Sequence, residues 1–204
     1  MKDGHRTALL TRATLVAFAI LLTAISADTH DGNPPDGDVS SRSSEPIESD
    51  LPEARLEVQK ANRKLLLYSG DTLLRVYPIG LGFNPIPPKR IQGDGATPEG
   101  DYMVCVKNPH SRYYLSLGLN YPNATDAQHA FERKLITKAE RNLIIDAARR
   151  GTCPPWNTQL GGEIFIHGRG SSSDWTLGCI ALDDPEMAEL FRVVALGTKV
   201  EIKP

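Results

Sequence analysis

The most informative segment of the sequence is residues 161–182, which read GGEIFIHGRGSSSDWTLGCIAL. It predicts a strand that delivers His167 at its end and then enters a glycine-rich turn. Twelve residues later Cys179 follows Gly178 and precedes a second apolar stretch. A cysteine nucleophile needs a nearby base, because a free thiol is mostly protonated at neutral pH. The spacing therefore indicates a histidine–cysteine pair, although a strand-end histidine and an inert buried cysteine would give the same pattern.

The glycine before the cysteine supports the catalytic interpretation. Because Gly178 has no side chain, the backbone at this point can approach a substrate carbonyl closely. The amide groups of Gly178 and Cys179 would then point at the oxyanion that develops on that carbonyl.

Outward from this stretch, residues 54–204 are expected to form one domain of mainly β structure. The segment is long enough for a single domain with its own core. Four prolines and three glycines make residues 84–100 a loop. Strands are predicted over residues 55–60, 101–107, 163–167 and 199–203, with a hairpin over 64–68 and 72–77.

Helices are expected only in the middle of this domain. Thr125 and Thr137 each begin a capping-box pattern, with Gln128 and Glu140 three residues further on. The second helix is expected to end at Gly151, after two arginines that suit the negative end of the helix dipole. The domain is therefore predicted to be β-dominated with an inserted helical pair.

The first 53 residues carry different signals. Lys2, Arg6 and Arg12 precede an uncharged apolar run over residues 13–27, which is shorter than the about 20 residues of a membrane-spanning helix. This pattern predicts an export signal over residues 1–27, with an uncleaved membrane anchor as the alternative. Residues 28–53 are predicted to be a disordered acidic linker, since they hold eight acidic residues against one basic residue. The domain would then lie in the periplasm or cell envelope.

Composition excludes several classes of protein. A chain of 204 residues with 40% hydrophobic and 24% charged residues is not collagen-like, wholly disordered or a polytopic membrane protein. Residues 54–204 carry 19 basic and 16 acidic residues without a dense basic stripe, so nucleic acid is a poor candidate partner. The small positive charge would suit an anionic polymer as substrate.

The residues around His167 and Cys179 resemble the L,D-transpeptidase catalytic domain, also called the YkuD domain, whose signature is His-Gly, a variable turn, then Ser/Thr-x-Gly-Cys. Three further stretches resemble the same family in the same order: GDGATPEGDY at residues 93–102, SLGLNYP at 116–122 and LGGEI at 160–164. The resemblance spans residues 54–204. It implies a β-sandwich or barrel with the helical insertion, and cysteine acyl transfer on peptidoglycan stem peptides without a metal or cofactor.

The resemblance also implies roles for individual residues. Cys179 would attack an amide carbonyl of a stem peptide and form a thioester, while His167 takes the thiol proton. The carbonyl of Gly168 would fix the tautomer of His167, and the amides of Gly178 and Cys179 would hold the oxyanion. The residues expected to bind substrate are Arg169, Trp175 and Thr176.

Two positions depart from the family pattern. Many members have histidine where Leu177 stands and arginine where Ala181 stands. The leucine leaves the expected general base in place, but the alanine removes a fixed cation. Arg169 could supply that charge from the turn, or it could be a solvated arginine.

Three functions follow from these patterns. The first is L,D-transpeptidation, used for cell-wall cross-linking or protein attachment, and the second is amide hydrolysis by the same nucleophile. The third is a cell-wall-binding module without catalysis, which an intact His167 and Cys179 argue against. A monomer is expected, with membrane contact only through an uncleaved N-terminal segment.

Two cysteines remain outside the predicted site. In an exported protein Cys105 and Cys153 are expected to form either a disulfide or two buried thiols. A zinc site from Cys153, His167 and Cys179 is not expected, because the spacing lacks paired close ligands.

Overall fold

The computed structural model describes residues 47, 51 and 53–204. The predicted export signal and nearly all of the predicted acidic linker lie outside these described residues. Within the described part of the chain, no helix is long and apolar enough to cross a membrane.

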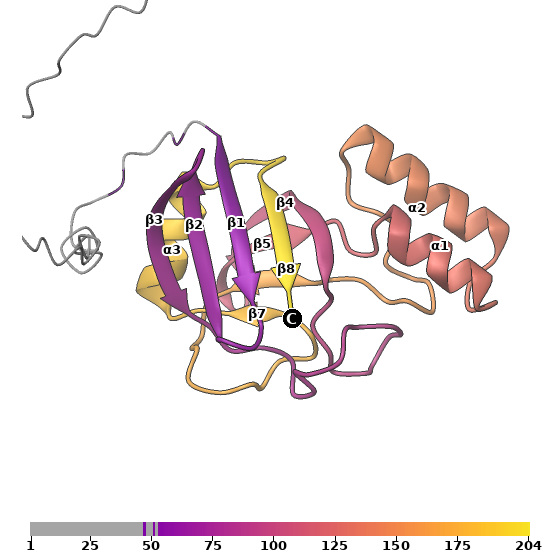
Figure 1. The fold of residues 1–204 in the computed structure, drawn as a ribbon, viewed down its shortest axis with the longest axis horizontal. Helices are drawn as coiled ribbons and strands as arrows, with labels where there is room; N and C mark the ends of the chain where they lie inside the picture. The colour runs from indigo at the N-terminus through magenta and orange to yellow at the C-terminus, as the bar shows by residue number, and fades with distance from the viewer. Residues whose placement is uncertain (1–46, 48–50, 52) are drawn as a thin grey trace, which may run out of the picture. The chain divides into compact units, whose positions relative to one another are not determined.

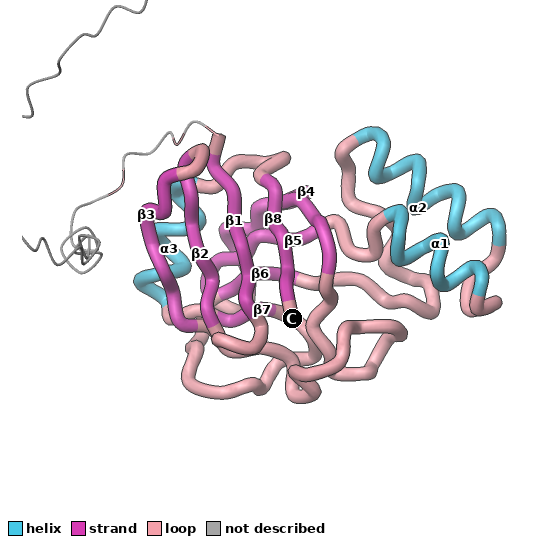
Figure 2. Tube along the Cα trace, viewed as in Figure 1, coloured by secondary structure: helices cyan, strands magenta, loops and turns pink. Residues whose placement is uncertain are grey.

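A single curled sheet of eight strands forms the body of the domain, as a half-barrel (Figure 2). Its strands are β1 (Ala54–Gln59), β2 (Lys64–Ser69), β3 (Thr72–Pro78), β4 (Gly100–Ser111), β5 (Tyr114–Leu119), β6 (Phe165–His167), β7 (Ile180–Ala181) and β8 (Lys199–Lys203). The spatial order is β3-β2-β1-β8-β4-β5-β6-β7, so β8 lies between the first strand and the central hairpin. The prediction of a mainly β domain is confirmed.

Most strand pairs are antiparallel, and two are parallel. β8 pairs with β1 in parallel, with Leu56 opposite Val200, and with β4 in antiparallel. β6 and β7 are the second parallel pair, with His167 opposite Ala181. Buried apolar side chains from the strands, among them Leu56, Leu117 and Ile166, form one continuous core. Burying each such side chain stabilises the fold by roughly 1.5–3 kcal/mol.

Two helices, α1 (Ala124–Glu132) and α2 (Lys138–Arg150), form the predicted insertion and lie beside β4 (Figure 1). The capping box predicted at Thr137 is confirmed, and Gly151 ends α2 in the left-handed conformation with φ 67°. The predicted start of α1 is wrong by two residues. Asn123 is the N-cap, because its side chain accepts from the amide of Asp126 and Asp126 bonds back to the Asn123 amide.

A third helix, α3 (Asp184–Val193), contradicts the expectation that helices occur only in the middle of the domain. It starts with Asp184-Pro185, and Met187, Leu190 and Val193 point into the sheet core. Strand β5 also lay outside the predicted strands, although it pairs with both β4 and β6.

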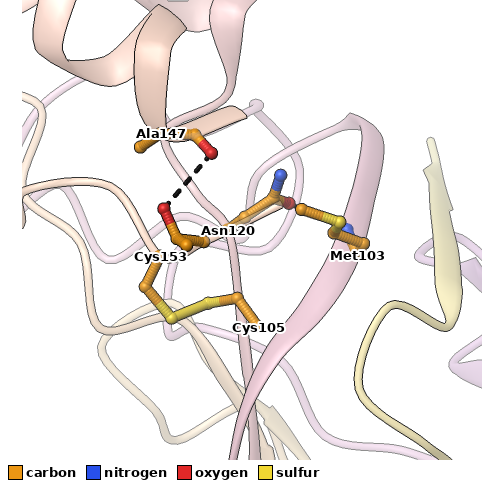
Figure 3. Close-up of a disulfide and its surroundings, with 6 residues drawn as sticks. Met103, Cys105, Asn120, Ala147 and Cys153 are labelled. Atoms are coloured by element: carbon orange, nitrogen blue, oxygen red, sulfur yellow. Dashed lines mark hydrogen bonds between the residues drawn. A yellow bond between two sulfur atoms is a disulfide. The ribbon is translucent and has the colours of Figure 1, made fainter. Parts of the chain in front are cut away.

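A disulfide between Cys105 and Cys153 fastens the helical insertion to the sheet. Cys105 lies in β4 and Cys153 is the third residue after the end of α2; Figure 3 shows the bond between them. The Thr152 hydroxyl donates to the carbonyl of Ala147 in the last turn of α2, which fixes the segment that carries Cys153. Of the two alternatives, the structure has the disulfide and not two thiols.

Candidate active site

The parallel pairing of β6 and β7 brings His167 and Cys179 to one region of the sheet. Ile166 lies opposite Ile180, so Cys179, which directly precedes β7, lies alongside Phe165. Because paired residues of parallel strands point to the same face and residues two apart share a face, His167 and Cys179 both project from one side. The predicted histidine–cysteine pair is therefore brought together by the fold.

An open cleft of about 690 Å³ lies over this face of the sheet. His167 and Cys179 both line it, as do the aromatic rings of Tyr113 and Trp175. Its wall also includes Lys89 from the 84–100 loop and Arg112 from the turn between β4 and β5. The cleft is large enough to hold several residues of a peptide beside the thiol.

The orientation of His167 is fixed by the neighbouring backbone. Its Nδ1 lies 2.7 Å from the carbonyl oxygen of Gly168, and a carbonyl can only accept, so Nδ1 carries the proton. Nε2 is then the basic nitrogen, and no described group forms a hydrogen bond with it. Burial lowers the pKa of His167 below its ordinary value of 6.5, although the Gly168 hydrogen bond opposes this shift. The imidazole is therefore neutral and able to accept a proton at pH 7.

Two aromatic rings enclose the imidazole. Tyr113 is stacked on it with ring centroids 4.7 Å apart, and Trp175 meets it edge-on at 5.6 Å. The indole nitrogen of Trp175 donates to the carbonyl of Gly170 at 3.1 Å. Trp175 thus forms part of the cleft wall and also packs on His167.

Within the described part of the chain, the thiol of Cys179 forms hydrogen bonds with two backbone groups. Its Sγ lies 3.4 Å from the Glu163 carbonyl and accepts from the Phe165 amide at 3.4 Å. Burial raises the pKa of Cys179 above its ordinary value of 9.0, while the Phe165 amide and the charge of Lys89 act to lower it. The site therefore holds a thiol and a neutral imidazole at pH 7.

The turn before Cys179 is held by the buried hydroxyl of Thr176. This hydroxyl donates to the Cys179 carbonyl at 2.7 Å and accepts from the Gly178 amide at 3.1 Å. Gly178 has φ 126°, and a Cβ there would lie 2.6 Å from the carbonyl oxygen of Ala96. Of the two amides expected to hold an oxyanion, that of Cys179 has no described acceptor, whereas that of Gly178 is bonded to Thr176.

The structure also shows where the charged groups lie. Arg169 is exposed, and it is not among the residues that line the cleft. Ala181 is fully buried between β6 and Gly80, so no cation stands at that position. The two cations in the cleft wall, Lys89 and Arg112, were not found by sequence reasoning. Only the combination of a loop and a distant turn brings them to the site.

A zinc site that uses Cys153 is excluded, because its sulfur is bonded to Cys105. Among the residues that the structure describes, no cluster of histidine, cysteine and carboxylate side chains could hold a metal ion.

Comparison with known proteins supports one family. The model of the YkuD family, described as the L,D-transpeptidase catalytic domain, matches residues 53–202. A candidate L,D-transpeptidase, YafK of Escherichia coli K12, is 37% identical over 87 residues. That match covers 40% of this chain and 35% of YafK, so the chain matches about a third of the length of this relative.

Solved structures share the fold. Bd1075 of Bdellovibrio bacteriovorus superposes with a TM-score of 0.50 at 20% identity, over 75% of this chain and 48% of that one. The helical cell shape determining protein Pgp2 of Campylobacter jejuni is 25% identical with a TM-score of 0.49, over 74% of this chain and 47% of its own. The likeness to Bd1075 is one of fold.

Proposed function

Since this chain belongs to the L,D-transpeptidase catalytic domain family, we propose that it transfers acyl groups of peptidoglycan stem peptides through a thioester on Cys179. The family acts on peptidoglycan stem peptides. The observation that carries the proposal is the arrangement of His167. Its Nδ1 proton is held by the Gly168 carbonyl, and Nε2 is left to take a proton inside the cleft that also contains Cys179.

The first half of the proposed reaction is acylation. His167 accepts the thiol proton at Nε2, and Sγ of Cys179 forms a bond to the carbonyl carbon of the peptide. The negative charge on the carbonyl oxygen is met by the free amide of Cys179. The amide C–N bond then breaks, and the departing amine takes the proton from His167.

The second half is attack on the thioester by an amine or by water. In either case the carbon–sulfur bond breaks, and the proton lost by the amine or the water passes through His167 to the sulfur of Cys179. An amine acceptor gives a new amide bond, which is cross-linking or attachment of a protein, and water gives a free carboxylate. The open cleft extends beyond Cys179 to Trp156 and Gln92, which leaves space for a second peptide. Binding an amine in that space in the right orientation can raise its effective concentration by several powers of ten, so that it competes with water for the thioester. We therefore favour transfer.

The experiment that tests this proposal supplies the purified protein with a donor tetrapeptide, with and without an amine acceptor, and identifies products by mass. Transfer predicts a cross-linked or exchanged product only when the acceptor is present. If free tripeptide accumulates equally in both reactions, the enzyme is an amide hydrolase. If neither product forms and the peptide only binds, the chain is a wall-binding module.

The location follows from the same argument. Peptidoglycan lies outside the cytoplasm, and the Cys105–Cys153 disulfide is typical of an oxidising compartment. Both the family and the disulfide favour a place in the cell envelope. The predicted export signal would deliver the chain there, and protease treatment of intact cells or spheroplasts tests it.

A further inference from the structure

The cleft wall contains few charged side chains. They are Lys89, Arg112 and Glu163, since His167 is neutral at pH 7. Ala181 is fully buried and uncharged, so it supplies no cation to the site. If a substrate carboxylate is recognised here, one of the two cations has to do it.

The ammonium group of Lys89 is already bonded to groups of its own loop. Its side chain is 3% exposed, and its ammonium lies 2.9 Å from Oδ1 of Asp94 and 3.0 Å from the carbonyl of Ile91. Asp94 is itself held by the amides of Arg90, Ile91 and Ala96. The charge of Lys89 is therefore compensated at short range, and its main effect is to fix the 84–100 loop.

Arg112 is in a different situation. It lies in the tight turn between β4 and β5, is exposed, and forms no ion pair with any described carboxylate. Its guanidinium carbon lies 4.9 Å from the ring centroid of Tyr113, and that ring is stacked on His167 at 4.7 Å. These spacings put the charge within about 10 Å of the imidazole, which is comparable to the screening length of about 10 Å in 0.1 M salt.

We infer that Arg112 binds the free carboxylate of the residue that leaves when Cys179 is acylated. The inference rests on the proposed function and names its donor: a peptide whose scissile amide is the last one in the chain. The departing amine takes its proton from His167, so the carboxylate of the same residue lies on the His167 side of the cleft. An arginine fork stacked on Tyr113 is suited to hold it, because a guanidinium can bond both carboxylate oxygens at once.

The main experiment compares a donor tetrapeptide that has a free C-terminal carboxylate with the same peptide as its C-terminal amide. The wild-type protein is expected to favour the acid by about tenfold or more in kcat/KM. Arg112→Gln should remove this preference, because it lowers kcat/KM for the acid and leaves kcat/KM for the amide unchanged. Arg112→Lys should retain part of the preference.

The control is Arg141→Gln. Arg141 is also stacked on an aromatic ring, 4.6 Å from the centroid of Phe131, but it lies outside the cleft. This variant should keep the wild-type preference. A wild-type preference below about twofold, or one that survives in Arg112→Gln, overturns the inference while the proposed function stands.

A second measurement does not depend on turnover. Cys179 is alkylated at low ionic strength with iodoacetate, which is anionic, and with iodoacetamide, which is neutral. Arg112→Gln should lower the ratio of the two rates by about twofold or more and leave the iodoacetamide rate unchanged, because only the anion is attracted. Arg141→Gln should change neither rate.

The two measurements separate the possible failures. If both rates fall equally in Arg112→Gln, Arg112 shapes the site and attracts no anion, and the inference is overturned. If no stem peptide is converted but the ratio falls as expected, the proposed function fails and the carboxylate site remains.

Discussion

The phenol ring of Tyr113 lies over the imidazole ring of His167, with the planes inclined by only 25°. The backbone of the same tyrosine also contacts the residue that follows β6, because its carbonyl accepts the Gly168 amide at 3.1 Å. The carbonyl of Gly168 in turn accepts from His167. Tyr113 therefore contacts His167 through its ring and also orients it through the backbone of Gly168.

We expect Tyr113→Leu to change the pH dependence of the reaction. Burial holds the pKa of His167 below 6.5, and the proposed role as a base requires the neutral imidazole. The kcat/KM of the wild-type protein should therefore fall as the pH drops below the pKa of His167. Loss of the ring admits water to the imidazole, which raises the pKa of His167 toward 6.5 and moves the acid limb of the pH profile to higher pH. Poorer orientation of the imidazole should also lower the rate by about tenfold. Tyr113→Phe keeps the ring and is the control. An unchanged acid limb in Tyr113→Leu would contradict this role.

Cys179→Ala should remove all measurable turnover and all alkylation by iodoacetamide. The reason is that Cys105 and Cys153 are joined, which leaves Cys179 as the free cysteine of the structure. Peptide mapping of the alkylated, unreduced protein checks this. Label on Cys105 or Cys153 in the variant would contradict the assignment of Cys179 as the reactive thiol.

His167→Ala should lower kcat/KM by about 10²–10⁴-fold, the usual range for a general base. His110→Ala and His129→Ala are matched controls, because both side chains are exposed and neither lines the cleft. The rates of all three variants are compared at neutral pH. A His167→Ala enzyme with most of its rate would show that another group takes the thiol proton.

Gly178→Ala should inactivate the protein while leaving it folded. The new Cβ would meet the Ala96 carbonyl at 2.6 Å in a backbone conformation with φ 126°, which costs roughly 1–3 kcal/mol and shifts the neighbouring nucleophile. Gly197→Ala is the control, since its φ is 85° but no atom lies within 4 Å of the new Cβ. Thermal melts and rates of both variants test the prediction, which fails if the two variants keep equal activity.

Removal of the disulfide should destabilise the domain by about 4 kcal/mol, from the chain entropy of a closed loop with a sequence separation of 48 residues. The free energy of unfolding of a Cys105→Ala/Cys153→Ala variant, measured with denaturant, gives the difference. A thiol count on the unfolded, unreduced protein is the direct check: one free thiol agrees with the bridge, and three would disprove it.

Local patterns were sufficient for much of the fold. The β2–β3 hairpin, β8 and the capped start of α2 depend on neighbouring residues, so alternation, turn residues and the Thr137 box predicted them. β5 was missed as a strand because Gly118 interrupts its apolar run. Glycine is required there because a Cβ would lie 2.5 Å from the Val106 side chain and 2.7 Å from the Phe165 ring, and both of these come from other strands.

The candidate site likewise contains some residues that a local pattern predicts and others that only the fold brings together. His167 and Cys179 were found because both lie in one short segment with a recognisable spacing. Lys89, Arg112 and Tyr113 come from segments about fifty or more residues away, and only the pairing of β5 with β6 brings the β4–β5 turn to the histidine. Thr176 was expected to bind substrate; it lines the cleft, and its hydroxyl forms two hydrogen bonds within the turn before Cys179.

The central position of β8 affects how the protein is assembled. Until its five residues pair with β1 and β4, the half of the sheet with His167 and Cys179 is paired with the other described half only through two short backbone bridges, Gly80 with Ala181 and Gly82 with Thr176. Both halves then present an open strand edge, which can pair with another chain. A polypeptide interrupted before Lys199 would therefore contain every residue proposed for the chemistry and still be prone to aggregate. Among the described strands, the one furthest along the chain is therefore the one that closes the sheet.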